Sequence, residues 1–366
     1  MRTRAQRHAD SKRTEGMYVR PNIARMQAYL PGEQPTESAW VKLNTNENPY
    51  PPSPEVAKAI LAEAAGELNQ YPDPMADAVR ERLATRFSLA RENFLVGNGG
   101  DDILTIVTRS IAGEKDLVAY PSPTYILYET LAELQAAKIH EVPYGPDFAI
   151  PEALFGSGAR LTFLANPNSP SGTAVPVKQI KRLADSLDGA LLVDEAYADF
   201  ADDTAMRLVG RAANLCVLRS FSKSFSLAGL RVGYLAGPVE LVSQFAKAKD
   251  SYNVNRLSMA AAAAALDDYD YMLENVERIR RSRCELTEAL DELGFSSLPS
   301  QANFIWTKVP SPGARSLYEK LKSRKILVRF WDRPAMSDYV RITVGTDKQV
   351  ELFLSTVREI IGAQDV

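Results

Sequence analysis

Seven short apolar segments, most of them separated by helical patterns, constrain the fold of this chain more than any other feature. They lie at residues 93–96, 116–120, 138–142, 161–165, 190–193, 215–218 and 232–236. Helical patterns, for example at residues 124–136 and 176–187, separate most of them. Continuous apolar strands that alternate with helices are typical of a largely parallel sheet covered on both faces. We therefore predict an α/β protein with a large domain at residues 54–255.

The pattern changes near residue 238. A helical stretch with an alanine run at 260–265 ends at Gly294, and strand patterns at 303–309, 326–330 and 339–344 then alternate with helical ones at 314–323 and 347–361. This predicts a small α+β domain at residues 256–366. Residues 17–53 are rich in proline and asparagine, so we expect an extended segment that contributes to the small domain and the active site. Residues 1–16 are expected to form a mobile N-terminal arm.

Composition argues against several classes of function. The 366 residues carry a net charge of −3, which is unlike the basic domain of a nucleic-acid binder. Two distant cysteines fit a reducing cytoplasm, and two histidines are too few for a histidine-rich metal site. No apolar run reaches the ~18 residues that span a membrane, and the basic start lacks the apolar core of a secretory signal. We predict a cytoplasmic protein that binds no metal, nucleic acid or membrane.

A single lysine, Lys223, lies among hydroxyl side chains shortly after the segment 215–218. Ser220, Ser222 and Ser224 surround it, and Arg231 follows eight positions later. A lone lysine is usually a solvated surface residue, but a solvated helix would carry other charges here. An uncharged lysine amine condenses with aldehydes, while hydroxyls and a guanidinium suit a phosphate. The segment therefore predicts a lysine that holds pyridoxal 5'-phosphate (PLP).

An acid, Asp194, directly follows the apolar segment 190–193, at the edge where ligands bind in open α/β sheets. A carboxylate there could pair with the protonated pyridine nitrogen of PLP and keep the ring electron-poor. The alternative is a helix N-cap. Tyr197 could reach the phenolic oxygen of the ring from the same turn, although a tyrosine alone is more often a core or rim residue.

Two turns follow other strands. Residues 97–101, Gly-Asn-Gly-Gly-Asp, precede a helical pattern at 102–111. Free N–H groups at a helix N-terminus bind anions, and glycines let a phosphate approach closely, although any strand–turn–helix connection could use such glycines. Residues 166–172, Asn-Pro-Asn-Ser-Pro-Ser-Gly, read as a turn by composition, and an amide there could also donate to the phenolic oxygen.

Two further side chains interrupt apolar surroundings. Tyr125 stands where a loop enters a helix after a strand, so its face could stack on a planar ring. Arg341 lies inside the apolar strand pattern 339–344. It could be an outward-pointing charge or a fork that binds a carboxylate.

In this order and spacing, the segments resemble the class I and II aminotransferases, which are fold-type I PLP enzymes. The resemblance covers about residues 18–362. It is carried by residues 44–49, 71–74, 97–101, 166–172, 194–197, 220–231 and 341–345. It implies a large domain with a mostly parallel sheet, a small α+β domain and a homodimer.

The resemblance also implies roles for individual residues. Lys223 would hold the cofactor covalently and move the substrate proton, while Asp194 and Tyr197 would contact the ring nitrogen and the phenolic oxygen. The remaining cofactor contacts would come from Gly100, Asp101, Tyr125, Asn168, Ser220, Ser222 and Arg231, with Tyr71 reaching the phosphate across the dimer interface. The substrate would be bound by Arg20, Tyr29, Asn46, Arg329 and Arg341.

The chain departs from the family pattern at two positions. Ser169 stands where most members have a second asparagine, which leaves open whether Asn168 or Ser169 contacts the cofactor. Gly100 stands where serine is common, so a hydroxyl is lost but the backbone N–H is kept.

Within the family, the resemblance is to members that act on L-histidinol phosphate. It implies transamination with 2-oxoglutarate, giving imidazole-acetol phosphate and L-glutamate, in histidine biosynthesis. The alternatives on the same scaffold are an aromatic amino acid aminotransferase and a threonine-phosphate decarboxylase. A PLP-binding regulatory protein would carry a DNA-binding domain, for which residues 1–20 are too short.

Overall fold

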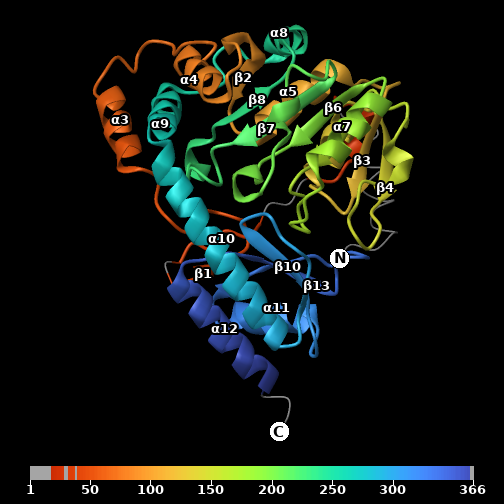
Figure 1. The fold of residues 1–366 in the computed structure, drawn as a ribbon, viewed down its shortest axis with the longest axis vertical. Coiled ribbons are helices and arrows are strands. Elements are labelled where there is room, and N and C mark those ends of the chain that lie inside the picture. The colour runs from red at the N-terminus through yellow and green to blue at the C-terminus, as the bar shows by residue number, and fades with distance from the viewer. Residues whose placement is uncertain (1–17, 29–31, 38, 363–366) are drawn as a thin grey trace.

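The computed structural model describes residues 18–28, 32–37 and 39–362. A seven-stranded sheet forms the centre of the larger of two units (Figure 1). Its strands are β2 (Phe94–Gly97), β3 (Leu117–Ser122), β4 (Lys138–Pro143), β5 (Leu161–Ala165), β6 (Ala190–Asp194), β7 (Leu215–Ser220) and β8 (Gly233–Ala236). Their order is β2-β8-β7-β6-β5-β3-β4, and only β8 runs antiparallel to its neighbours. The predicted α/β class with a mostly parallel sheet is confirmed.

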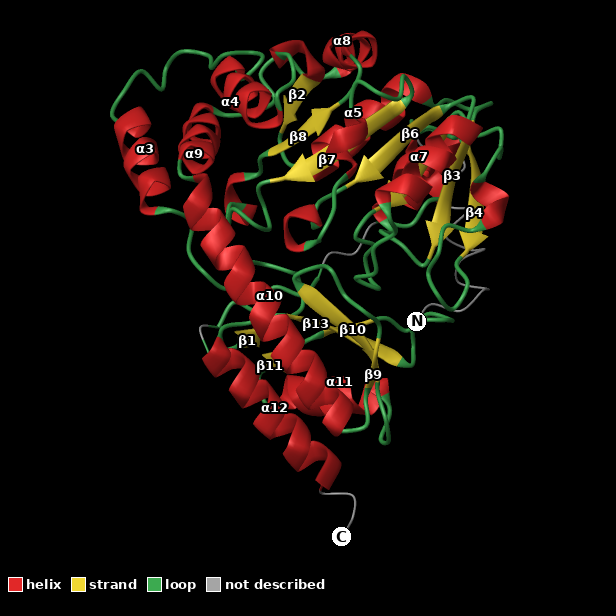
Figure 2. Cartoon of the chain, viewed as in Figure 1, coloured by secondary structure: helices red, strands yellow, loops and turns green. Residues whose placement is uncertain are grey.

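Helices cover both faces of this sheet (Figure 2). One face is covered by α5 (Gly100–Ile111), α6 (Leu127–Leu134) and α8 (Val239–Ala248), and the other by α3 (Pro54–Ala64), α4 (Asp77–Phe87), α7 (Val177–Ser186) and α9 (Arg256–Asp267). Successive strand residues point to opposite faces. In β6, Leu191 and Val193 therefore pack in one apolar cluster and Leu192 in the other. This two-sided burial explains why the inner strands read as continuous apolar runs, whereas the edge strand β4 is mostly exposed.

The smaller unit contains two short sheets. β9 (Ser296–Ser297), β10 (Phe304–Lys308), β12 (Arg329–Phe330) and β13 (Tyr339–Thr343) form an antiparallel sheet in the order β12-β13-β10-β9, while β1 (Val41–Lys42) pairs in parallel with β11 (Ile326–Leu327). The strand predicted at 326–330 thus divides at Val328, since its two halves join different sheets. α11 (Ala314–Ser323) and α12 (Asp347–Gly362) pack in the apolar cluster of this unit. β1 brings the N-terminal segment into it.

A long helix, α10 (Tyr269–Glu292), connects the two units (Figure 1). Met272, Val276 and Ile279 pack in a cluster of the large unit, whereas Leu286 and Leu290 pack in that of the small unit. The expected division at residue 255 stays a prediction, and this packing favours a boundary inside α10. Near the N-terminus, α2 (Pro21–Arg25) lies against α6. Among the described residues, no helix is both long and apolar enough to cross a membrane.

Adjacent residues of α12 provide a test of the small-unit core. Phe353 is fully buried, while Leu352 is 48% exposed. We expect Phe353→Ala to lower the free energy of unfolding by about 3–5 kcal/mol because it leaves a cavity. Leu352→Ala is the matched control and should change it by no more than about 0.5 kcal/mol. Urea denaturation measures both, and equal losses would contradict the packing described.

Candidate active site

A cavity of about 490 Å³ lies at the carboxyl ends of β5, β6 and β7 and is closed by residues of the small unit. Ligands of open α/β sheets bind at this edge. Many predicted site residues, which are far apart in sequence, line this one cavity. They are Asn46, Gly100, Asp101, Tyr125, Asp194, Tyr197, Ser220, Ser222, Lys223, Arg231, Arg329 and Arg341.

Lys223 projects from the loop after β7 and is half-buried. Its Nζ donates to the Thr45 carbonyl at 3.3 Å and lies 5.6 Å from the centre of the Tyr197 ring. The amide of Asn48 donates to the carbonyls of Lys223 and Ser224 at 3.0 and 3.1 Å. The N-terminal segment therefore contacts both the side chain of the lysine and the backbone of its loop.

Asp194, at the end of β6, is a buried carboxylate with two donors. The Tyr128 hydroxyl donates to its Oδ2 at 2.7 Å, and the Ala196 N–H donates to its Oδ1 at 3.1 Å. Burial raises the pKa of Asp194 to about 6, and these two hydrogen bonds oppose the rise only in part. A cationic ring nitrogen would supply the missing charge. The carboxylate is thus suited to a protonated pyridine.

Tyr128 was missed by sequence reasoning. Its ring is fully buried and stacks on Phe163 with centroids 4.6 Å apart and planes 4° apart. Tyr125, three residues earlier, lines the cavity, and that i, i+3 spacing is the signal that could have drawn attention to Tyr128. The buried hydroxyl also has its own pKa raised, first by desolvation and then by Asp194, so it stays a hydrogen-bond donor.

An anion cradle forms at the start of α5. Gly99 has a positive φ of 89°, and a Cβ there would come within 2.7 Å of Arg231. The guanidinium of Arg231 donates to the Ser222 hydroxyl at 3.4 Å and to Asp101 at 3.3 Å. Free N–H groups of a helix start, a hydroxyl and an arginine are the donors that phosphates bind in proteins. Gly233 allows the start of α5 to lie close to β8, since a Cβ at that position would be only 2.8 Å from the Gly100 nitrogen.

Two arginines occupy the small-unit side of the cavity. Arg329 and Arg341 are directly opposed residues of β12 and β13. Their guanidinium carbons lie 5.2 and 5.1 Å from the centre of the Trp331 ring. Arg341 is buried and donates to the Ser169 hydroxyl and the Asn44 carbonyl, both at 3.0 Å. Two cations at one end of a cavity favour an anionic substrate group. The sequence around Trp331 has no pattern that predicts its place beside the two arginines.

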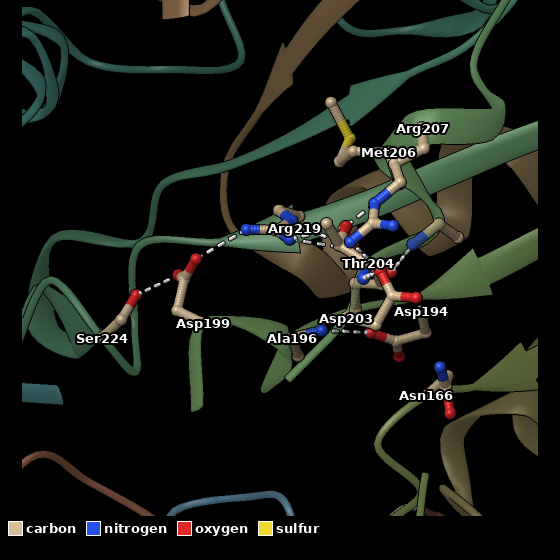
Figure 3. Close-up of polar contacts among 12 residues, drawn as sticks. Asn166, Asp194, Ala196, Asp199, Asp203, Thr204, Met206, Arg207, Arg219 and Ser224 are labelled. Carbon is tan, nitrogen blue, oxygen red and sulfur yellow. Dashed lines mark hydrogen bonds and ion pairs between the residues drawn. The ribbon is translucent and has the colours of Figure 1, made fainter. Parts of the chain in front are cut away.

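A buried ion network lies next to the site residues in the chain (Figure 3). Arg219 pairs with Glu195 at 3.0 Å and with Asp199 at 2.6 Å, and the Ser224 hydroxyl donates to Asp199. Glu195 follows Asp194, Arg219 precedes Ser220 and Ser224 follows Lys223. The network therefore ties together the immediate neighbours of three cavity residues.

Other predicted residues lie elsewhere. Asn168 is buried outside the cavity lining, and its amide donates to the Pro123 carbonyl and the Ser171 hydroxyl at 3.1 and 2.8 Å, whereas Ser169 lines the cavity. Arg20 donates to the Leu134 carbonyl at 3.1 Å, at the end of α6, and does not line the cavity.

Tyr71 is 78% exposed and stacks on Tyr252, with ring centres 4.4 Å apart, away from the cavity of its own chain. Tyr29 lies outside the described residues. Within residues 18–28, 32–37 and 39–362, no group of three or more histidine, cysteine and acidic side chains could hold a metal ion.

The raised pKa of Asp194, about 6, makes a prediction about pH and stability. The pKa of aspartate in an unfolded chain is about 3.9. Ionisation of Asp194 therefore costs free energy only in the folded protein. The contribution of Asp194 to stability therefore falls as the pH rises from about 4 to about 6. Without cofactor, Asp194→Asn should be more stable than the wild type by ~3 kcal/mol at about pH 7.5, and by less than ~0.5 kcal/mol at about pH 4.

Urea denaturation at the two pH values measures this difference. The exposed Asp188 offers a control, because Asp188→Asn should change stability little at either pH. A pH-independent difference for Asp194→Asn would contradict the burial penalty.

Known proteins resemble this chain over most of its length. The family described as aminotransferase class I and II matches residues 38–357. Histidinol-phosphate aminotransferase 1 of Nostoc sp. is 43% identical over 95% of this chain and 99% of that protein, and histidinol-phosphate aminotransferase of Rhodopirellula baltica is 43% identical over 96% and 98%. A crystal structure of histidinol-phosphate aminotransferase from Sinorhizobium meliloti in complex with pyridoxal-5'-phosphate superposes with a TM-score of 0.83, at 27% identity, over 88% of this chain and 91% of that one. The predicted resemblance is confirmed, and the chain belongs to the class I and II aminotransferase family.

Proposed function

We propose that this chain is a PLP-dependent aminotransferase that exchanges an amino group between L-histidinol phosphate and 2-oxoglutarate in histidine biosynthesis. The observation that carries the proposal is a single cavity with Lys223 between a phosphate cradle and a pair of arginines. Relatives with that activity in their names, 43% identical over nearly the whole chain, support the choice of substrate.

The residues of the cavity fit PLP. The cradle at the start of α5, with Ser222 and Arg231, suits its phosphate, and the buried carboxylate of Asp194 suits its protonated ring nitrogen. Tyr197 and Tyr125 line the same space and suit its phenolic oxygen and its ring face. When bound, PLP withdraws electrons from the carbon that carries the amino group, so that a proton can leave it.

Lys223 is the residue placed to move that proton. Lys223 lines the cavity, the Asn48 amide holds its loop, and the Thr45 carbonyl at 3.3 Å accepts one hydrogen of its amine. A lysine in this position takes a proton from one atom and returns it to another as a general base and acid. Asp194, at the far end of the ring site, would counter positive charge without taking the proton.

Arg329 and Arg341 explain how two different substrates could share one site. Histidinol phosphate carries a phosphate and 2-oxoglutarate carries carboxylates, and both anions suit a pair of guanidinium groups. The arginines are held in register by strand pairing and by the ring of Trp331. The substrates would bind alternately to the same cavity, which gives ping-pong kinetics.

A second copy of the chain belongs to the proposal. Tyr71 and Tyr252 form an exposed stacked pair, 78% and 46% exposed. Large aromatic side chains are enriched at interfaces between subunits, so we infer a homodimer in which Tyr71 contacts the neighbouring cofactor phosphate. A cytoplasmic location is also inferred, and the free thiols of Cys216 and Cys284 support it.

Removing the lysine tests the proposed chemistry. We expect Lys223→Ala to abolish the visible absorbance of the lysine-bound cofactor and to lower turnover by roughly 10³-fold or more, because both the attachment point and the proton carrier are lost. Absorbance spectra and steady-state rates measure the two effects. Lys247→Ala, at an exposed position of α8, is the matched control and should leave both unchanged. Retained absorbance in Lys223→Ala would mean that another lysine is used.

A comparison of amino donors tests the substrate. With 2-oxoglutarate as acceptor, the ratio kcat/KM should be larger for L-histidinol phosphate than for phenylalanine, since only the former carries a phosphate for the two arginines. A larger value for phenylalanine would instead identify an aromatic amino acid aminotransferase. Release of carbon dioxide from threonine phosphate without 2-oxoglutarate would identify a decarboxylase.

A further inference from the structure

Tyr197 is connected to the small unit by a chain of hydrogen bonds through Asn46. The backbone N–H of Asn46 donates to the Thr343 Oγ1 at 3.0 Å, and that hydroxyl donates to the Asn46 Oδ1 at 3.2 Å. The Asn46 Nδ2 in turn donates to the Tyr197 hydroxyl at 2.9 Å. Asn46 and Thr343 are only 1% and 3% exposed, so water does not compete for the two bonds between them.

The direction of each bond follows from the one before it. A hydroxyl has a single hydrogen. Because the Thr343 hydroxyl oxygen accepts from a backbone N–H, its own hydrogen is available for Oδ1 of the Asn46 side chain. The amide of Asn46 must then turn its NH₂ group toward Tyr197. The Tyr197 oxygen is therefore an acceptor in this bond, and its hydrogen is left to point elsewhere.

The backbone fixes Asn46 in this position. Its φ of 57° lies in the left-handed region, which asparagine adopts more readily than most residues. The Asn303 amide donates to its carbonyl at 3.0 Å. The Tyr197 ring packs edge-on against Phe304, with centres 5.0 Å apart and planes at 84°. Since Tyr197 lines the cavity, the hydrogen that is not used by Asn46 can be donated into it.

The same segment contacts the arginine strand. Thr343 and Arg341 lie two residues apart on β13 and so face the same side. Arg341 donates to the Asn44 carbonyl at 3.0 Å, and the Thr343 N–H donates to the Leu43 carbonyl at 2.9 Å. β13 therefore carries both Arg341 and the threonine that begins the hydrogen-bond chain to Tyr197.

We propose that Thr343 and Asn46 are positioning residues that make Tyr197 a hydrogen-bond donor to the ligand in the cavity. Asn46 then acts through Tyr197, in place of the substrate contact expected from the sequence. The proposal rests on the proposed function in one respect, which is that the acceptor is the phenolic oxygen of PLP. A bond donated to that oxygen stabilises its proton-free form, so its loss raises the pH at which the visible absorbance of the bound cofactor changes.

Asn46→Asp is the sharpest test. The substitution keeps the shape and the acceptor for Thr343, but its second carboxylate oxygen would accept from Tyr197 and reverse that bond. We expect the absorbance midpoint of the holoenzyme to rise by about one pH unit, as in Tyr197→Phe. In a Tyr197→Phe background, Asn46→Asp should add little. An unchanged midpoint in N46D, or a shift that persists in full without the tyrosine hydroxyl, would overturn the proposal.

A neutral pair of variants repeats the test without a new charge. Thr343→Ser keeps the hydroxyl and should retain the wild-type midpoint, whereas Thr343→Val should raise it. Equal midpoints in T343S and T343V would overturn the proposal, even if N46D failed to fold. Other charged groups of the cavity stay the same in every variant, namely Glu47, Asp101, Asp194, Lys223, Arg231, Arg329 and Arg341.

Failure of the proposed function would look different. In that case the wild-type protein would show no visible absorbance that depends on Lys223, and no midpoint could be measured. A wild-type midpoint that none of these variants moves would reject the hydrogen-bond chain alone.

Discussion

The burial of one carboxylate, that of Asp194, is the constraint on which the active site depends. The end of β6 places it inside the protein, where desolvation raises its pKa to about 6 despite donors from Tyr128 and Ala196. A buried charge that is paired only with neutral donors costs stability. A cationic group bound next to the carboxylate, such as the proposed protonated ring, would remove this cost. Its binding would therefore be favoured by the same amount.

Side chains that line the cavity and side chains that support it are neighbours in sequence at the ends of β6 and β7. Asp194 and Ser220 reach the cavity, while their neighbours Glu195 and Arg219 form the buried ion network (Figure 3). The two-residue alternation of a strand turns Arg219 and Ser220 of β7 to opposite faces, and Glu195 directly follows the last residue of β6. The network fixes the backbone on which the functional side chains stand, and it draws in the lysine loop through Ser224 and Asp199.

Much of this arrangement could be predicted from the sequence, for physical reasons. Strands buried on both faces read as apolar runs, and a polar residue at the end of such a run, such as Asp194, is visible in the sequence. Tyr128 could not be predicted in the same way, because its partner lies 66 residues away. The turn at 166–172 was recognised, but not that Asn168 would use its amide within the fold and leave Ser169 at the cavity. Arg20 shows the same limit, since its contact with the end of α6 depends on tertiary packing.

The central claim is that the amine of Lys223, and no other, holds the cofactor. Borohydride reduction of the holoenzyme fixes such a linkage permanently, and digestion followed by mass spectrometry locates it. One pyridoxyl group is expected, on the peptide that contains Lys223. A label on a different lysine, or an unlabelled Lys223 peptide in protein that retains PLP, would contradict it.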